Sequence, residues 1–268
     1  MAIRKVIKAY IELHWGYSVK KPLYTATQPS FKIPPPTALL GALAYSASVI
    51  EEDYREIVKI GDDLGSKVLK YLDVCPWVTY RLLDHEFRHV DTRVLAETKD
   101  IVRIIQSLGV RTEHIRVGSP MLRGIATYGK VFMPGSFIEA LFMAKEEGLE
   151  KYVWGLTRLG TRESIISVSK AESVSFEVVN GVDEVETVYL FPKSLAMQVR
   201  GEYDVIELPK PQPEWFIFKL GKVPSELIEH FIVPVKGSVK VRPSSEACVI
   251  KIYEPKETYV LIPRYVVK

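Results

Sequence analysis

A basic, hydroxyl-rich loop is the part of this sequence best suited to bind an anion. Residues 24–43 read YTATQPSFKIPPPTALLGAL, so Ser30 and Lys32 precede a triple proline and Thr37 follows it. Proline is favoured at the first position of a helix, and the free backbone N–H groups at a helix N-terminus attract anions. The pattern indicates a phosphate-binding loop, although a Pro-rich turn leading into a buried helix explains the same residues equally well.

Candidate catalytic and metal-binding residues are few. Of the five histidines, only His85 and His89 have the i, i+4 spacing that places two ligands on one helix face, and Asp84, Glu86 and Asp91 lie nearby. No HExxH motif or Cys/His set completes a site, so a solvated loop pair is the favoured interpretation. The sequence also lacks GxGxxG, GxxxxGK[ST] and GxSxG, the motifs of nucleotide-dependent and acyl-transfer enzymes. It therefore predicts neither a metal ion nor a cofactor.

Positive charge is concentrated in two parts of the chain. The net charge is only +3, but residues 1–50 carry six Lys and Arg side chains against Glu12 alone. Residues 103–130 carry five against Glu113 alone. Clustered cations are expected of a protein that binds a polyanion such as nucleic acid. On charge alone, a solvated surface is an equally good explanation.

The elements that position these residues are predicted to form an α+β fold. Apolar residues make up 47% of the chain and charged residues 26%, as in ordinary globular proteins. Apolar and polar residues alternate over residues 5–15, as in a strand with one buried face. Further patterns predict helices over 37–50, 53–72, 100–108 and 147–158, and strands over 77–83, 137–144, 165–168 and 174–179. This succession predicts a ferredoxin-like domain over 1–180, with an insertion at about 85–127.

Residues 181–268 are predicted to form a small C-terminal all-β lobe. Asn180-Gly181 is a turn signal and marks the boundary between the lobes. Short strand candidates separated by Pro and Gly follow at 188–191, 203–208, 215–220, 238–242, 248–253 and 258–262. No apolar run is long enough to span a membrane, so we expect a soluble, cytoplasmic protein. One Asn and four Gln in the whole chain are typical of a thermophile.

Two motifs resemble those of a family of CRISPR-associated proteins. The run SFKIPPPTALLGAL at 30–43 and the turn RLGTRES at 158–164 are similar to motifs of the fifth Cas family. Its members are RAMP proteins that cap the 5′ handle of the CRISPR RNA (crRNA) in type I Cascade complexes. The resemblance implies a ferredoxin-like RAMP domain of the RRM type, and the composition suggests the archaeal subtype I-A. The implied partners are crRNA, the Cascade backbone subunit and the Cascade large subunit, with target DNA as a further candidate.

The resemblance also implies which residues contact RNA. The insertion would be a thumb whose arginines bind phosphates, while Met121 and Leu122 wedge beside a displaced base. The implied RNA-binding residues are Tyr17, Ser18, Ser30, Phe31, Lys32, Arg111, Arg116, Met121, Leu122, Arg123, Arg158, Gly160 and Arg162. For Gly160 there is an alternative, because a Gly at this position could simply end the preceding helix as its C′ residue.

A non-catalytic RNA-binding subunit is favoured over an enzyme. One branch of the family cleaves the crRNA precursor without metal. The resemblance implies that this branch has a Tyr before the Pro-rich helix start and a Lys-His pair. This sequence has Phe31 there and no Lys-His dipeptide, so His14 and His114 remain as candidate acids or bases. Two alternatives stay open: a metal-independent endoribonuclease that processes pre-crRNA, and a protein-only assembly subunit whose basic residues are incidental.

Overall fold

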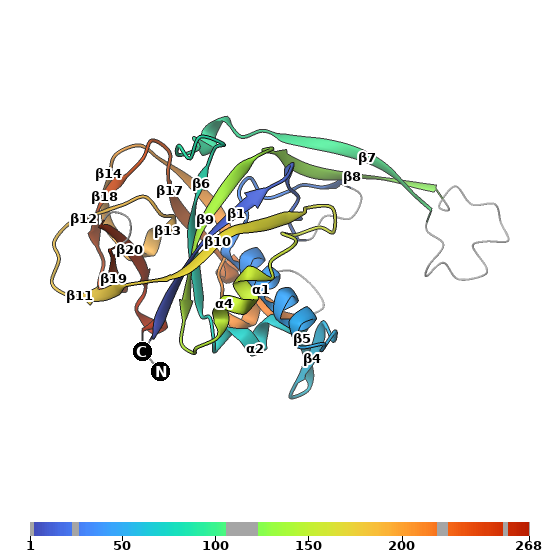
Figure 1. Cartoon of the computed structure of the whole chain (residues 1–268). Helices are drawn as coiled ribbons and strands as arrows, with labels where there is room; N and C mark the ends of the chain where they lie inside the picture. Colours follow the sequence, from blue (N-terminus) through green and yellow to red (C-terminus); the bar gives the residue numbers. More distant parts are fainter. Residues whose placement is uncertain (1–2, 23–26, 106–122, 219–224, 254–256, 268) are drawn as a thin grey trace.

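A computed structural model describes residues 3–22, 27–105, 123–218, 225–253 and 257–267. Over these ranges the chain is mostly β-structure (Figure 1). Its α-helices are α1 (Pro36–Ile50), α2 (Val68–Leu72) and α4 (Leu149–Trp154). The predicted mixture of helices and strands is therefore present, but helix is scarcer than the sequence pattern indicated.

A four-stranded antiparallel sheet forms the centre of the first 180 residues. Its order is β10 (Ile166–Val174), β1 (Lys5–Leu13), β9 (Ser136–Ala144) and β6 (Trp77–Leu83). Because side chains alternate between the two faces of a strand, Ile7, Ala9 and Ile11 of β1 share one face, and all three are fully buried. These four predicted strands are confirmed, and β10 extends further than predicted.

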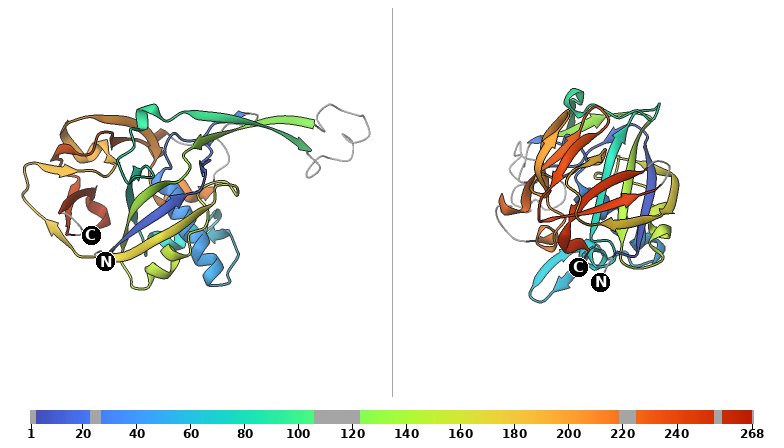
Figure 2. Two further views of the ribbon diagram at one scale, coloured as in Figure 1. Left: turned by 45° about the horizontal axis from the view of Figure 1, so that its top comes forward. Right: turned by 90° about the vertical axis from the view of Figure 1, so that its left-hand side faces the viewer.

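Helices α1 and α4 pack against this sheet and against each other (Figures 1 and 2). Helix α1 begins at Pro36, where the missing N–H leaves no bond unmade and the fixed φ already suits a helix. Small residues such as Ala44 and Ala47 are buried along it, so the helix axis can approach its neighbours closely. The predicted helices at 37–50 and 147–158 are confirmed, the second in a shorter form.

The predicted helix over 53–72 is wrong. The chain instead forms a hairpin of β4 (Ile57–Ile60) and β5 (Asp63–Ser66), and only α2 after it is helical. Gly61 has φ +58° in the two-residue turn, a conformation that favours Gly and suits a hairpin. The apolar residues at helical spacing that suggested a helix include Ile57 and Val58, which are β-branched and favour strands. A further short strand, β16 (Ile217–Phe218), pairs with β5.

A long antiparallel hairpin projects from the body of the molecule (Figures 1 and 2). It consists of β7 (Glu97–Ile105) and β8 (Arg123–Phe132), so the predicted helix over 100–108 is wrong over 100–105, and 106–108 lie outside the described residues. The run Ile101, Val102, Ile104 and Ile105 has the β-branched composition of a strand. At its base, β8 also pairs with β2 (Gly16–Tyr17) and with β3 (Thr27–Gln28). The short 3₁₀ turn η1 (Thr92–Val94) precedes the hairpin.

The C-terminal part contains three small antiparallel sheets. Their orders are β11-β19-β20, β12-β18-β14 and β13-β17-β15. The strands are β11 (Phe176–Val179), β12 (Val185–Thr187), β13 (Phe191–Pro192), β14 (Ala196–Arg200), β15 (Tyr203–Pro209), β17 (Ile228–Pro234), β18 (Val239–Pro243), β19 (Ala247–Ile252) and β20 (Thr258–Pro263). Sequence patterns missed β12, β14 and β17. The strand predicted at 215–220 begins as a 3₁₀ turn, η4 (Pro213–Phe216), and is a strand only over β16; residues 219–220 lie outside the described residues.

The C-terminal part packs directly on the central sheet. The ring of Trp77 in β6 stacks on Phe231 in β17 with 6.5 Å between ring centroids. Tyr189 donates a hydrogen bond to Glu139 in β9, and Glu139 also accepts one from Arg81 at 2.8 Å and lies 3.5 Å from Lys8. A buried ion network therefore lies where the two parts meet. Among the described residues, no helix is long and apolar enough to cross a membrane.

Candidate nucleic-acid interface

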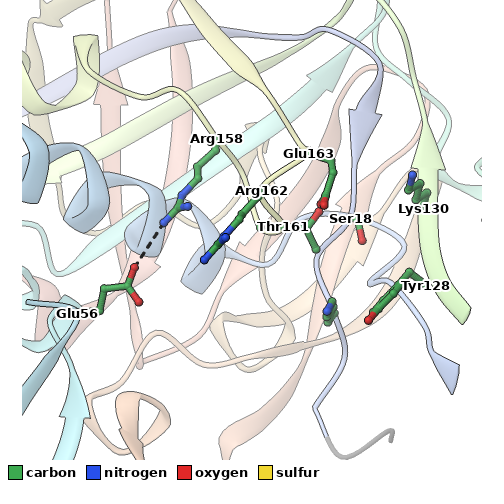
Figure 3. A pocket seen from close by; sticks show the side chains of 10 residues that line it. Ser18, Glu56, Tyr128, Lys130, Arg158, Thr161, Arg162 and Glu163 are labelled. Atoms are coloured by element: carbon green, nitrogen blue, oxygen red, sulfur yellow. Dashed lines mark ion pairs between the residues drawn. The ribbon is translucent and has the colours of Figure 1, made fainter. Parts of the chain in front are cut away.

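A basic groove lies between the base of the long hairpin and the turn at 158–164 (Figure 3). Its volume is about 810 Å³. Four of its lining residues are cationic and two are acidic; the full lining is Ser18, Lys20, Glu56, Tyr128, Lys130, Arg158, Gly160, Thr161, Arg162 and Glu163. The residues come from the loop after β1, from β8 and from the turn before β10, except for Glu56, which precedes β4. Strands and loops far apart in the sequence thus meet in one positively charged surface.

The groove continues toward the start of helix α1. A second hollow of about 330 Å³ shares Lys20, Arg158 and Gly160 with the first. It reaches Pro35 and Thr37, which flank the first residue of α1. The sequence analysis singled out both this Pro-rich helix start and the 158–164 turn, and the structure brings the two together.

Ser18 joins the three segments that form the groove. Its backbone carbonyl accepts a hydrogen bond from the Thr161 N–H at 2.9 Å, and its own N–H donates to Ser164 Oγ at 2.9 Å. Its hydroxyl donates to the Gly129 carbonyl at 2.8 Å. Only 1% of the surface of Ser18 is exposed, so its buried hydrogen bonds hold the turn and the base of β8 together.

Gly160 is required by this close packing. Its φ is +87°, and a Cβ added there would lie 2.3 Å from the Ser18 carbonyl oxygen. Helix α4 ends at Trp154 with Gly155 at its C-cap, so the interpretation of Gly160 as the C′ residue of that helix is wrong. The glycine instead lets the turn lie directly against the loop after β1.

Ser30 fastens the Pro-rich loop to the same place. Its hydroxyl accepts from the Val19 N–H at 3.1 Å, and its own N–H donates to Glu97 Oε1 at 2.7 Å. Glu97 lies so close to Gly129 that a Cβ at position 129 would be 1.7 Å from its carboxylate oxygen. The base of the hairpin, the Pro-rich loop and the loop after β1 therefore form one interlocked unit.

Three of the four cations that line the groove, Lys20, Lys130 and Arg158, lie over aromatic rings. Lys20 Nζ lies 4.2 Å from the centroid of the Tyr128 ring, and Lys130 Nζ lies 5.3 Å from that of Trp15. Phosphate binds to such cations, while aromatic rings are platforms on which bases stack. The groove thus carries both kinds of chemistry that hold single-stranded nucleic acid.

The two arginines of the turn differ in their surroundings. The Arg158 guanidinium lies 3.6 Å from the Tyr45 ring centroid and 3.8 Å from a Glu56 carboxylate oxygen. Arg162 is exposed and forms no ion pair with any described residue. Arg162 is therefore the cation most open to a phosphate.

Several predicted RNA-binding residues have inward-facing side chains. Tyr17 is fully buried and donates to the Lys32 carbonyl, and burial raises the pKa of its hydroxyl. Phe31 is only 6% exposed, and the Lys32 ammonium pairs with Asp204 at 3.1 Å. Tyr17 is fully buried, and the small exposed part of Phe31 lines the second hollow, so little of either side chain is open to RNA. Ser18 and Ser30 are also nearly buried, and the RNA contacts of these residues stay predictions.

The predicted thumb residues lie largely outside the described part. Arg111, Arg116, Met121 and Leu122 fall outside the described residues. Arg123 begins β8 opposite Ile105, at the end of the hairpin ladder remote from the groove. These roles stay predictions.

Sequence reasoning missed Lys20, Tyr128 and Lys130 as site residues. The lysines were counted in the charge clusters, but they could be assigned to one site only through the β2–β8 pairing. A basic residue two positions from an aromatic one, as in Tyr128 and Lys130, was the available signal.

The histidines among the described residues do not line the groove. His14 Nε2 lies 3.0 Å from Ser167 Oγ, and His89 is largely buried with Nε2 against the Pro234 carbonyl. Burial lowers the pKa of His89. The Asp84 and Asp91 carboxylates, which could have joined His85 and His89 at a metal, are hydrogen-bonded by Arg88 and Arg93. Nowhere in the described residues do three potential metal ligands cluster.

The fold and groove define a mostly β protein, built on an antiparallel sheet, that presents a basic and aromatic-lined surface. A structure described as a CRISPR protein from Archaeoglobus fulgidus is similar over 97% of this chain and 100% of that chain, with a TM-score of 0.58 and 17% identity. No family model matches the chain.

Sequence relatives give the family. The chain is 30% identical over 201 residues to the CRISPR system aCascade subunit Cas5 1 of Saccharolobus solfataricus, covering 73% of this chain and 75% of that protein. It is 32% identical over 202 residues to CRISPR-associated protein Cas5 3 of the same organism, with the same coverage. This chain belongs to the Cas5 family of CRISPR-associated proteins, which confirms the resemblance drawn from its motifs.

Proposed function

We propose that this chain is a non-catalytic crRNA-binding subunit of a type I-A Cascade complex, which holds the 5′ handle of the RNA in the groove. The observation that carries the proposal is the convergence of Lys20, Lys130, Arg158 and Arg162 with the Tyr128 ring on one surface. A relative named as an aCascade subunit supports the assignment to such a complex. The backbone and large subunits would be its protein partners, with target DNA as a further candidate, in the cytoplasm.

The central sheet, in this proposal, is a ferredoxin-like RAMP domain. The chain order β1, α1, β6, β9, α4, β10 and the sheet order β10-β1-β9-β6 support this, because they follow the βαββαβ plan. The long hairpin would be the thumb predicted at about 85–127. The division into a domain over 1–180 and a lobe over 181–268 belongs to the same proposal.

RNA would be held by charge and stacking. Arg162 and Lys130 would meet phosphates, since contacts to the backbone position a nucleic acid without reading its sequence. A base would stack on the Tyr128 ring, on the side that Lys20 leaves open. Ser18 and Gly160 would act indirectly, by keeping the turn and the base of β8 in register.

A binding role without cleavage is supported by the chemistry of the groove. Cleavage at a 2′-OH needs a general base and an acid near the leaving oxygen. The described lining contains no histidine, and Phe31, where the cleaving branch has a Tyr, is buried. Endoribonuclease activity remains the alternative function, and the test below distinguishes it.

The test is a titration of purified protein with RNA that carries the repeat-derived 5′ handle, at several salt concentrations and without metal. We expect binding that weakens with salt, and RNA that stays intact over hours. Specific cleavage that disappears in His14→Ala or His114→Ala would establish the endoribonuclease instead. Absence of binding by the chain, both alone and within its complex, would leave a protein-only assembly subunit.

A further inference from the structure

An exposed apolar stripe crosses the small sheet β16-β5-β4. The large side chains Ile57, Leu64 and Phe218 are 54%, 51% and 53% exposed. Leu64 lies directly opposite both Lys59 and Phe218, so all three share one face, and Ile57 joins them two residues before Lys59. Each strand of the sheet therefore contributes one apolar side chain to the same solvent-facing surface.

The opposite face of this sheet packs against the protein. A Cβ at Gly65 would lie 2.5 Å from Leu69 Cδ1 and 3.0 Å from the Phe216 carbonyl oxygen. The apolar stripe is therefore not the side of the hairpin that holds it on the body. Scattered apolar residues on a surface are normal, but three large, half-exposed ones on one face of a small sheet are a feature of interaction sites.

Strand β4 forms the edge of this sheet, and it pairs only with β5 among the described residues. The two-residue turn closes on the pair Ile60 and Asp63, which in such hairpins exchanges both hydrogen bonds. Bonding then alternates along an antiparallel pair, so the N–H and C=O groups of Ile57 and Lys59 point outward. An open edge of this kind is a template for another strand.

Acidic residues surround the free edge. Asp62 and Asp63 form the tip of the hairpin and have no ion pair within the described part of the chain. Glu56, just before β4, is 81% exposed and lies 3.8 Å from Arg158. Exposed Lys59 lies within the strand and Arg55 precedes Glu56, so the net negative charge is at the hairpin tip, where Asp62 and Asp63 favour a cationic partner segment.

We propose that β4 is the docking edge for an extended segment of a protein partner, which adds one strand to the sheet. Its alternate side chains would be apolar and cover the stripe of Ile57, Leu64 and Phe218, and Lys or Arg residues would face Asp62 and Asp63. Main-chain hydrogen bonds would give affinity, and the apolar stripe would fix the register. Glu56 also lines the RNA groove, but the apolar stripe and the tip of the hairpin do not, so this inference does not depend on RNA binding.

The test is site-specific crosslinking within the complex purified from the host cells through a tag on this chain. Phe218→p-benzoylphenylalanine places the probe on the stripe, and Met197→p-benzoylphenylalanine, at a 68% exposed position on β14, is the matched control. Lys59→Pro removes an outward N–H without touching the β4–β5 ladder, because proline is tolerated on the open side of an edge strand. Lys59→Ala removes the same side chain but keeps the N–H.

We expect Phe218→p-benzoylphenylalanine to crosslink to a protein segment with alternating apolar residues and flanking Lys or Arg. Lys59→Pro should reduce that crosslink about tenfold, the effect of a lost hydrogen bond and its neighbours, while Lys59→Ala leaves it unchanged. Leu64→Lys is a second test in case the proline disturbs the hairpin. It keeps the β4–β5 ladder intact, and it should reduce the crosslink as Lys59→Pro does. A crosslink to RNA or to a second copy of this chain, no crosslink, or a crosslink insensitive to both variants would overturn the proposal. RNA binding should be unchanged throughout.

Discussion

Gly160 lies against the backbone of Ser18 so closely that a single added carbon at position 160 would fall 2.3 Å from the Ser18 carbonyl oxygen. This contact joins the turn before β10 to the loop after β1, and both segments line the groove.

Gly160→Ala should destabilise the protein by about 3 kcal/mol, because it combines a left-handed φ with a backbone clash. Gly181→Ala is the matched control: Gly181 has φ +71°, but nothing lies within 4 Å of the added Cβ. We expect this control to cost only about 1 kcal/mol. Urea unfolding of both variants measures the difference, and equal losses would show that the contact with Ser18 is unimportant.

Arg162→Ala should weaken binding of RNA carrying the 5′ handle without changing the melting temperature, because its side chain is exposed and has no ion pair in the described structure. Loss of one phosphate contact to a single strand should reduce the slope of log K against log salt by about 0.7. Arg200→Ala, at a 65% exposed side chain on β14, should change neither quantity. An unaltered slope in Arg162→Ala would remove this arginine from the interface.

Tyr128→Ala should weaken RNA binding by about tenfold or more, since a stacked base contributes about 1–3 kcal/mol. Tyr128→Phe keeps the ring and should bind normally. Tyr203→Ala, which removes a partly exposed tyrosine from β15, serves as the control. If Tyr128→Phe is as weak as Tyr128→Ala, the hydroxyl rather than the ring makes the contact.

Glu139→Gln should cost about 3 kcal/mol at neutral pH, because it leaves the charges of Lys8 and Arg81 without their carboxylate in a buried place. Burial pushes the pKa of Glu139 upward, but the hydrogen bond and charge of Arg81, with Tyr189 and Lys8, hold it below its ordinary value.

The pH dependence follows from that direction. A carboxyl whose pKa is lowered by folding stabilises the protein above its unfolded pKa of about 4.3, and this contribution is lost as the pH falls further. Urea unfolding between pH 7 and pH 3 should therefore show a smaller acid loss for Glu139→Gln than for the wild type. Identical acid losses would mean that the Glu139 pKa is the same in both states.

Much of the central sheet could be predicted from local patterns. Alternation over 5–15 and the Pro-rich start of α1 are signals read from neighbouring residues, and both led to the observed elements. The wrong helix assignments at 53–72 and at 100–105 arose where apolar residues happened to fall at helical spacing. The tight turn at Gly61 and pairing with β16 decided the first segment, and pairing with β8 decided the second.

The groove could be predicted only in part, because local motifs identify loops but do not show which loops meet. The motifs identified the Pro-rich loop and the 158–164 turn, but not that Tyr17 and Phe31 face inward. The joining of Lys20 to Tyr128 depends on the register of β8 against β2 and β3, which no local pattern gives.

Hydrogen bonds around Gly129 hold the base of the long hairpin in a fixed position, about which its far end can tilt. The Ser18 hydroxyl donates to the Gly129 carbonyl of β8, and the Ser30 N–H donates to the Glu97 carboxylate of β7, which lies beside Gly129. From the Glu97–Val131 pair to the Ile105–Arg123 pair the ladder spans eight steps, about 27 Å at strand rise. A tilt of about 5° at the base would therefore displace the far pair by about 2 Å. A force on the far end of the hairpin would be transmitted to the hydrogen bonds of Ser18 and Ser30 at its base.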